Sequence, residues 1–197
     1  MSQLIIESFQ TNLEETERLT SWVFETIRPY LMDRVLQADS GEDAMTRLLI
    51  ESGTTLQLNA RSESQRDYLR EQYKDVPLVR GIHRIDFSTH KMEVRYKDFQ
   101  GRFATVLAFN DFINRGFFEK GSIHKAGRFL MEGGHLITIG VARDCFFPGA
   151  EQDAETLKKY NYDRIKVLLG NFQIMLIRFF DWNELCFLAI AQKPPVQ

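Results

Sequence analysis

Three acidic residues, Asp39, Glu42 and Asp43, form a compact group of potential metal ligands, and they lie on either side of Gly41. If their carboxylate oxygens converged, they could coordinate a hard cation such as Mg²⁺ or Ca²⁺. The same residues also suit the first turn of a helix, where the helix dipole favours negative side chains. We favour the second interpretation and expect no metal site.

The other side chains with chemical potential are scattered along the chain. The histidines form no HxH, HxxH or HExxH pattern, and they are His83, His90, His124 and His135. The two cysteines, Cys145 and Cys186, form no CxxC pair. We therefore assign no catalytic residue, and we expect two buried thiols in a reducing cytoplasm.

The composition excludes several classes of protein. The chain has 197 residues, of which 44% are apolar and 26% charged, as in a folded domain with a single core. Its 25 basic and 27 acidic residues leave no basic excess for nucleic acid or an anionic membrane. No apolar run has membrane-spanning length, and residues 1–10 do not resemble a secretory signal. We expect one cytoplasmic domain, with no membrane span and no nucleic-acid partner.

Short apolar segments alternate with helical patterns. Strands are expected at 34–38, 54–59, 78–85, 103–109, 135–141, 172–180 and 185–191. Helices are expected at 12–31, with a bend or end at Pro29, and at 42–51, 63–73 and 152–169. The unbroken apolar runs at 103–109 and 135–141 are typical of parallel strands covered on both faces.

These elements predict an α/β three-layer sandwich of the Rossmann type. Its mostly parallel seven-stranded sheet should end in an antiparallel C-terminal hairpin, because the connection at 181–184 is too short for a helical crossover. Residues 1–30 form an N-terminal helical segment, and residues 31–193 form the core. The side chains expected inside it are Val35, Leu36, Leu56, Leu58, Val106, Leu107, Leu136 and Ile139.

Four motifs follow one another in a particular order. Residues 35–43 read VLQADSGED, residues 102–110 RFATVLAFN, residues 129–137 FLMEGGHLI and residues 157–160 LKKY. Together they resemble class I S-adenosylmethionine-dependent methyltransferases. They match the V-L-E-x-G-x-G-x-G motif, the fourth strand, the glycine turn into the fifth strand and a Y-R-R-Y stretch of a small-molecule and sugar group. The resemblance covers about residues 30–193 and implies a Rossmann-like fold and S-adenosylmethionine as cofactor.

The sequence departs from that family where the cofactor would bind. Asp39 and Asp43 replace the first and third glycines, which give the loop its close approach to the cofactor. Gln37 replaces the glutamate that faces the cofactor's ammonium group, and Asn59 replaces the carboxylate that accepts both ribose hydroxyls. From the resemblance, a degraded cofactor site is made of Gln37, Asp39, Gly41, Asp43, Asn59 and Asn110.

The resemblance also places a substrate pocket beside that site. Its candidate residues are Asp111, Phe112, His124, Phe146, Phe147, Lys158 and Tyr160. The family often has Glu and His a few residues after strand four, but Ile113 and Asn114 stand there in this chain, so no general base is visible.

Three functional hypotheses follow. The first is a methyltransferase-like protein with a degraded S-adenosylmethionine site and no cofactor, which acts as a non-catalytic partner, scaffold or regulatory subunit. Its ligand would be another protein or a second copy of itself. The second is an active enzyme that methylates a small molecule or sugar with S-adenosylmethionine. The third is the same fold rebuilt around another ligand, with the acidic loop facing a cation or polyamine. We favour the first.

Overall fold

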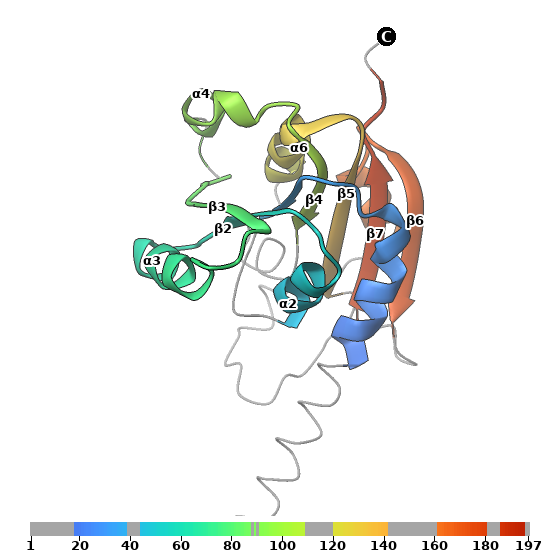
Figure 1. The fold of residues 1–197 in the computed structure, drawn as a ribbon. Coiled ribbons are helices and arrows are strands. Elements are labelled where there is room, and N and C mark those ends of the chain that lie inside the picture. The colour runs from blue at the N-terminus through green and yellow to red at the C-terminus, as the bar shows by residue number, and fades with distance from the viewer. Residues whose placement is uncertain are drawn as a thin grey trace, which may run out of the picture.

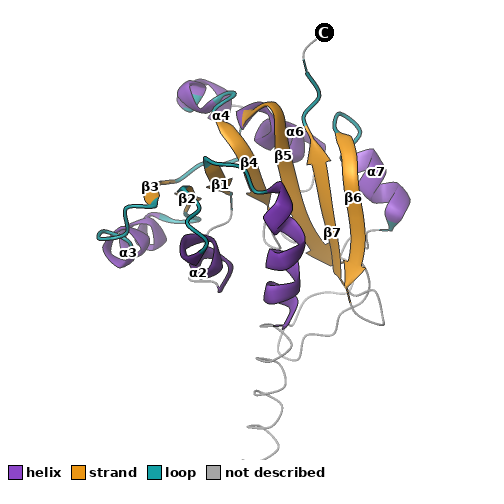
Figure 2. Ribbon diagram, turned by 45° about the vertical axis from the view of Figure 1, so that its right-hand side comes forward, coloured by secondary structure: helices purple, strands orange, loops and turns teal. Residues whose placement is uncertain are grey.

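Seven strands form one mixed sheet in the order β3-β2-β1-β4-β5-β7-β6 (Figure 1). The structure is a computed structural model that describes residues 18–38, 44–87, 89, 91–108, 120–141, 161–180 and 186–195. Helices pack on both faces of the sheet, so the predicted three-layer α/β arrangement is confirmed (Figure 2).

Five of the strands run parallel. They are β1 (Val35–Gln37), β2 (Leu56–Asn59), β3 (Val79–His83), β4 (Phe103–Ala108) and β5 (Leu130–Val141). All six residues of β4 are buried, as expected for a strand covered on both faces. Leu36 lies between Gln57 of β2 and Val106 of β4, which places β1 in the middle of the parallel part.

The last two strands form the predicted antiparallel hairpin. They are β6 (Gln173–Phe180) and β7 (Cys186–Gln192), and β7 also pairs antiparallel with β5. Ile137 of β5 lies opposite Ile190 of β7, which in turn lies opposite Leu176 of β6. Strand β7 therefore enters the sheet between β5 and β6, and β6 becomes its outer strand.

The helices divide between the two faces. A helix at residues 18–27 and α2 (Ala44–Glu51) pack on one face, whereas α6 (Lys120–Phe129) and α7 (Tyr162–Leu168) pack on the other. Helix α3 (Glu63–Gln72) and the short α4 (Met92–Arg95) lie toward the β3 end of the sheet (Figure 1). Pro29 lies in the 3₁₀ turn η1 (Arg28–Tyr30), which follows the α-helix at residue 27, so the predicted end of the first helix near Pro29 is confirmed.

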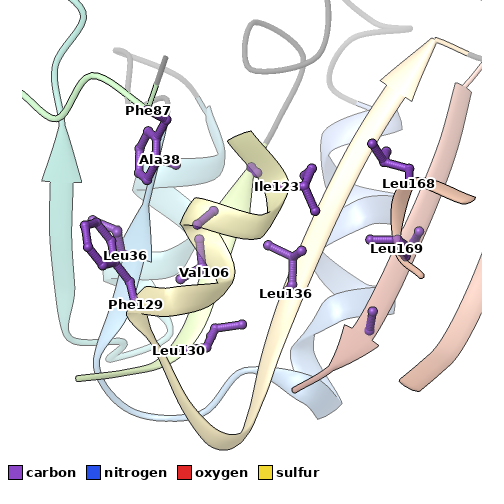
Figure 3. Close-up of a cluster of buried hydrophobic side chains, with 14 of the residues drawn as sticks. Leu36, Ala38, Phe87, Val106, Ile123, Phe129, Leu130, Leu136, Leu168 and Leu169 are labelled. Carbon is purple, nitrogen blue, oxygen red and sulfur yellow. The ribbon is translucent and has the colours of Figure 1, made fainter. Parts of the chain in front are cut away.

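The hydrophobic core agrees with the sequence. All eight side chains expected to be buried are buried. Figure 3 shows one cluster, in which Leu36, Val106 and Leu136 come from three strands. Ile123 and Phe129 cover them from α6. A second 3₁₀ turn, η2 (Lys97–Phe99), adds Phe99 to the edge of this cluster.

Three features differ from the expectations. Helices α4 and α6 were not predicted, and β5 begins at Leu130 rather than at His135. The early part of β5 is irregular, because Phe103 pairs with Leu130 whereas Thr105 pairs with His135. Gly133 supplies the left-handed turn inside this bulge, at φ +73°. Helix α7 begins at Tyr162, and the earlier part of the helix expected at 152–169 lies outside the described residues.

Candidate functional site

The carboxyl ends of the parallel strands meet at one edge of the sheet, where ligands of such folds bind. Two of the predicted cofactor-site residues, Gln37 and Asn59, end β1 and β2 at this edge. His124 is described as well and lies on α6. The other predicted site residues lie outside the described residues, and they are Asp39, Gly41, Asp43, Asn110, Asp111, Phe112, Phe146, Phe147, Lys158 and Tyr160.

Asn59 is buried, and its side-chain amide is bound on both sides by main-chain groups. Its Nδ2 donates to the carbonyl oxygens of Ala38, at 2.7 Å, and of Ile85, at 3.1 Å. Its Oδ1 accepts a hydrogen bond from the Ile85 amide at 2.6 Å. Two carbonyl partners and one N–H partner fix which end of the amide is nitrogen. The side chain therefore joins the ends of β1 and β2 to the segment that follows β3.

Gln37 also has a partner within the protein. The Thr46 hydroxyl of α2 donates to Gln37 Oε1 at 2.9 Å, and both side chains are fully buried. Gln37 thus points toward α2. It lies level with Leu58, the residue before Asn59 on β2. Because successive side chains of a strand point to opposite faces, the side chain of Asn59 lies on the other face of the sheet. A hydrogen bond between two buried neutral groups stabilises this strand–helix contact by about 1 kcal/mol.

Lys125 of α6 extends the contacts at this edge. Its side chain is only 9% exposed, and its ammonium group donates to the Phe87 carbonyl oxygen at 3.1 Å. The Phe87 ring lies beside Ala38 in Figure 3, and its centroid is 5.8 Å from that of Phe129. We call Ala38, Asn59, Ile85, Phe87 and Lys125 the carboxyl-edge seam. Their hydrogen bonds connect the ends of β1 and β2 and the segment after β3 to helix α6.

Lys125 is a site residue that was not predicted from the sequence. A lysine on a helix normally extends into water, and burial of its ammonium group is rare without a partner. Its partner is the main-chain carbonyl of Phe87, which lies 38 positions away in the sequence. No local pattern could therefore have singled it out.

His83 lies opposite Asn59 at the end of β3. Its Nε2 is hydrogen-bonded to Gln57 Oε1, and its ring meets Phe99 edge-on with the centroids 4.7 Å apart. Burial lowers the pKa of His83 below its usual 6.5, and the positive charge of Arg70 lowers it further. The imidazole is therefore neutral at pH 7, with Nε2–H donating to the Gln57 amide oxygen.

His124 is exposed, with Nδ1 3.0 Å from the Asn171 amide nitrogen. Asn171 lies just before β6, the strand at the far end of the sheet order from β2 and β3. The structure therefore brings Gln37 and Asn59 to the ends of two neighbouring strands, whereas His124 is bonded to the segment before β6.

In the described part of the chain, no three His, Cys, Asp or Glu side chains come together as ligands for a metal ion. No helix there combines the length and the apolar character needed to cross a bilayer. The acidic residues Asp39, Glu42 and Asp43 lie outside the described residues.

Comparisons by sequence find no counterpart, because no protein-family model matches and no curated protein matches either. Comparisons by structure find solved structures with a similar fold. A SAM-dependent methyltransferase from Methanosarcina mazei superimposes with a TM-score of 0.61 at 14% identity, over 86% of this chain and 97% of the other. The chain has a methyltransferase fold. N-methyltransferase NodS from Bradyrhizobium japonicum WM9 gives 0.62 at 12% identity, over 91% of this chain and 96% of the other.

A third solved structure shows how little this methyltransferase fold says about the reaction. The [4+2]-cyclase SpnF matches with a TM-score of 0.68 at 14% identity, over 90% of this chain and 81% of the other. Its name describes a cyclisation. Function therefore has to be argued from the residues of the site, because one fold carries different activities.

Proposed function

We propose that this methyltransferase-fold protein no longer uses S-adenosylmethionine and acts as a non-catalytic partner, scaffold or regulatory subunit. The observation that carries the proposal is the set of hydrogen bonds made by Asn59. By resemblance, this position would accept the two ribose hydroxyls of the cofactor. Here the side chain binds the protein itself.

The chemistry of Asn59 argues against a ribose site. Both amide hydrogens of Nδ2 are used by Ala38 and Ile85, and one lone pair of Oδ1 is used by Ile85. Two hydroxyl donors need two acceptors, and at most one lone pair is left. Asn59, Ala38 and Phe87 are each at most 5% exposed, so a ligand would have to move the seam to reach them. These positions do not fit the cofactor.

The first-motif residues support the same conclusion. Gln37 carries no charge for an ammonium group, and its amide oxygen already accepts the Thr46 hydroxyl. Asp39 and Asp43 would add side chains and negative charge where the family keeps glycines. Each such departure costs about 1–3 kcal/mol, whereas a micromolar affinity corresponds to only about 8 kcal/mol. Together these losses would remove most of the affinity.

The alternative is an active methyltransferase with an unusual cofactor loop, which would take S-adenosylmethionine and a small molecule or sugar. The names of neighbours such as NodS favour it, and so does the Lys158–Tyr160 stretch that resembles a small-molecule group. A cytoplasmic location, a single domain and the lack of a nucleic-acid partner stay predictions from the sequence.

Titration calorimetry with S-adenosylmethionine and with S-adenosylhomocysteine tests the proposal. We expect dissociation constants weaker than about 100 µM, which corresponds to about 2.7 kcal/mol lost from a micromolar site. The SAM-dependent methyltransferase from Methanosarcina mazei, titrated in the same buffer, serves as the positive control. A low-micromolar constant, or cofactor that stays with the protein through purification, would support the active enzyme instead.

A further inference from the structure

We propose that the outer edge of β6 binds the same edge of a second copy of this chain, through antiparallel strand pairing. Strand β6 is the last in the sheet, and within the described part of the chain its only strand neighbour is β7. Seven of its eight residues pair along that inner side, and Met175 lies in an irregularity between Ile174 and Leu176. On its outer side β6 pairs with no strand of the described residues, so its main-chain N–H and C=O groups on that side have no ladder partner there.

The side chains of β6 are those of an interior strand. The sequence QIMLIRFF contains one charged residue, Arg178, and no proline. Ile177 and Phe179 are half-buried against the core on one face of the sheet, and Leu176 is half-buried against the core on the other. Met175 is 44% exposed. Proteins usually protect an edge strand with charges, proline, a bulge or short length. Strand β6 has one charge and one irregularity, at Met175, and its regular part from Leu176 to Phe180 has no proline.

The opposite edge of the sheet shows what such protection looks like. Strand β3 has only five residues, and its charged Arg80 and the following Arg84 are exposed. Its middle residue, Gly81, is crowded by the side chains of Gln57 and His83. The two edges of one sheet therefore differ in length, charge and apolar content, and β6 is the edge suited to pairing.

Helix α7 lies beside β6 in Figure 2 and also carries exposed apolar side chains. Six large apolar side chains are exposed in the described part of the chain, and three belong to these two elements: Tyr162, Val167 and Met175. Val167 is 67% exposed. A partner on the edge would therefore also find an apolar flank to cover.

The unpaired main-chain groups select a β-strand as the occupant, because a strand supplies N–H and C=O groups at the matching spacing. A second copy offers the same apolar strand, and antiparallel pairing of identical strands generates a closed twofold dimer. A register centred on Ile177 sets Ile177 opposite its own copy and Arg178 opposite Leu176. The two guanidinium groups are then not directly opposed. This inference does not depend on whether the cofactor site is functional.

Sedimentation equilibrium of the full chain tests the proposal. We expect a dimer at micromolar concentration and at least a tenfold weaker dimer in Met175→Lys, which adds a charge at an exposed position of the edge. Val94→Lys is the matched control, because Val94 of α4 is 83% exposed and lies away from β6. It should leave the dimer unchanged. Circular dichroism confirms that both variants are folded.

Hydrogen exchange locates the contact. Amides in a peptide that covers 173–180 should exchange more slowly at dimeric than at monomeric concentration, whereas a peptide that covers 79–83 should not change. A wild-type chain that stays monomeric overturns the proposal. So does a dimer in which the exchange of residues 173–180 is independent of concentration, or one that Val94→Lys weakens as much as Met175→Lys.

Discussion

Asn59 and Ile85 are joined by two hydrogen bonds that imitate one step of a β-ladder. The Ile85 amide donates to Asn59 Oδ1, and Asn59 Nδ2 donates back to the Ile85 carbonyl oxygen. The same nitrogen also donates to Ala38. A side chain thus continues the sheet beyond β2 and β3, at the edge where a methyltransferase fold would hold its cofactor.

The first prediction concerns Asn59→Asp. A carboxylate cannot donate, so its oxygens would face the carbonyl oxygens of Ala38 and Ile85 in a buried site. We expect a loss of about 2–4 kcal/mol in the free energy of unfolding, measured with urea at pH 7. Asn161→Asp is the matched control. Asn161 caps α7 by accepting a hydrogen bond from the main-chain amide of Arg164, and an aspartate oxygen accepts equally well there. If Asn59→Asp keeps its stability and gains S-adenosylmethionine binding, the seam is not what excludes the cofactor.

This pair also shows where sequence reasoning stops. From the sequence, Asn59 is a lost acceptor that aspartate would restore. In the structure its partner Ile85 lies 26 positions away, and the contact makes the amide nitrogen the essential atom. The sheet, in contrast, could be predicted, because segments such as Phe103–Ala108 carry their apolar pattern locally.

Helix α6 illustrates the same boundary. Gly121 and Gly127 lower its intrinsic helix propensity, and the helix was not predicted. The structure supplies a reason for one of them: a Cβ at Gly127 would overlap the Phe172 ring, which packs against this helix. The glycine fits a tertiary contact that no local pattern reveals.

The second prediction follows from these two glycines. Gly127→Ala should lower the free energy of unfolding by about 1 kcal/mol, because displacing the partly buried Phe172 outweighs the gain in helix propensity. Gly121→Ala, with open space at its Cβ position, should instead raise it by up to about 1 kcal/mol. Thermal and urea unfolding measure both. Equal stabilisation by the two variants would mean that the Phe172 ring moves aside freely.

The third prediction concerns pH. Because burial lowers the pKa of His83 in the folded protein, the unfolded chain binds more protons below pH 6.5. The stability tied to neutral His83 is complete above that pH and is lost as pH falls through the lowered value. We expect His83→Gln to reduce the dependence of unfolding free energy on pH between about 5 and 7. His124→Gln, on the exposed side of α6, is the control. An unchanged slope in His83→Gln would show that His83 does not couple protonation to folding.

The fourth prediction concerns Thr138 of β5, whose side chain is fully buried. Its hydroxyl makes no hydrogen bond with any residue in the described part of the chain. Burying an unpaired hydroxyl costs about 1–3 kcal/mol, and valine has nearly the same shape without it. Thr138→Val should therefore raise the free energy of unfolding by about 1 kcal/mol in urea titrations.

Thr105 is the matched comparison for Thr138, because it lies on neighbouring β4 and is equally buried. Its hydroxyl oxygen accepts a hydrogen bond from the Met32 amide at 3.1 Å. Thr105→Val removes that acceptor and should lower the stability by about 1 kcal/mol, so the same substitution acts with opposite sign on two adjacent strands. If Thr138→Val is also destabilising, the Thr138 hydroxyl has a hydrogen-bond partner in solution. The surroundings of Thr138 are then more polar than the apolar core around Leu136.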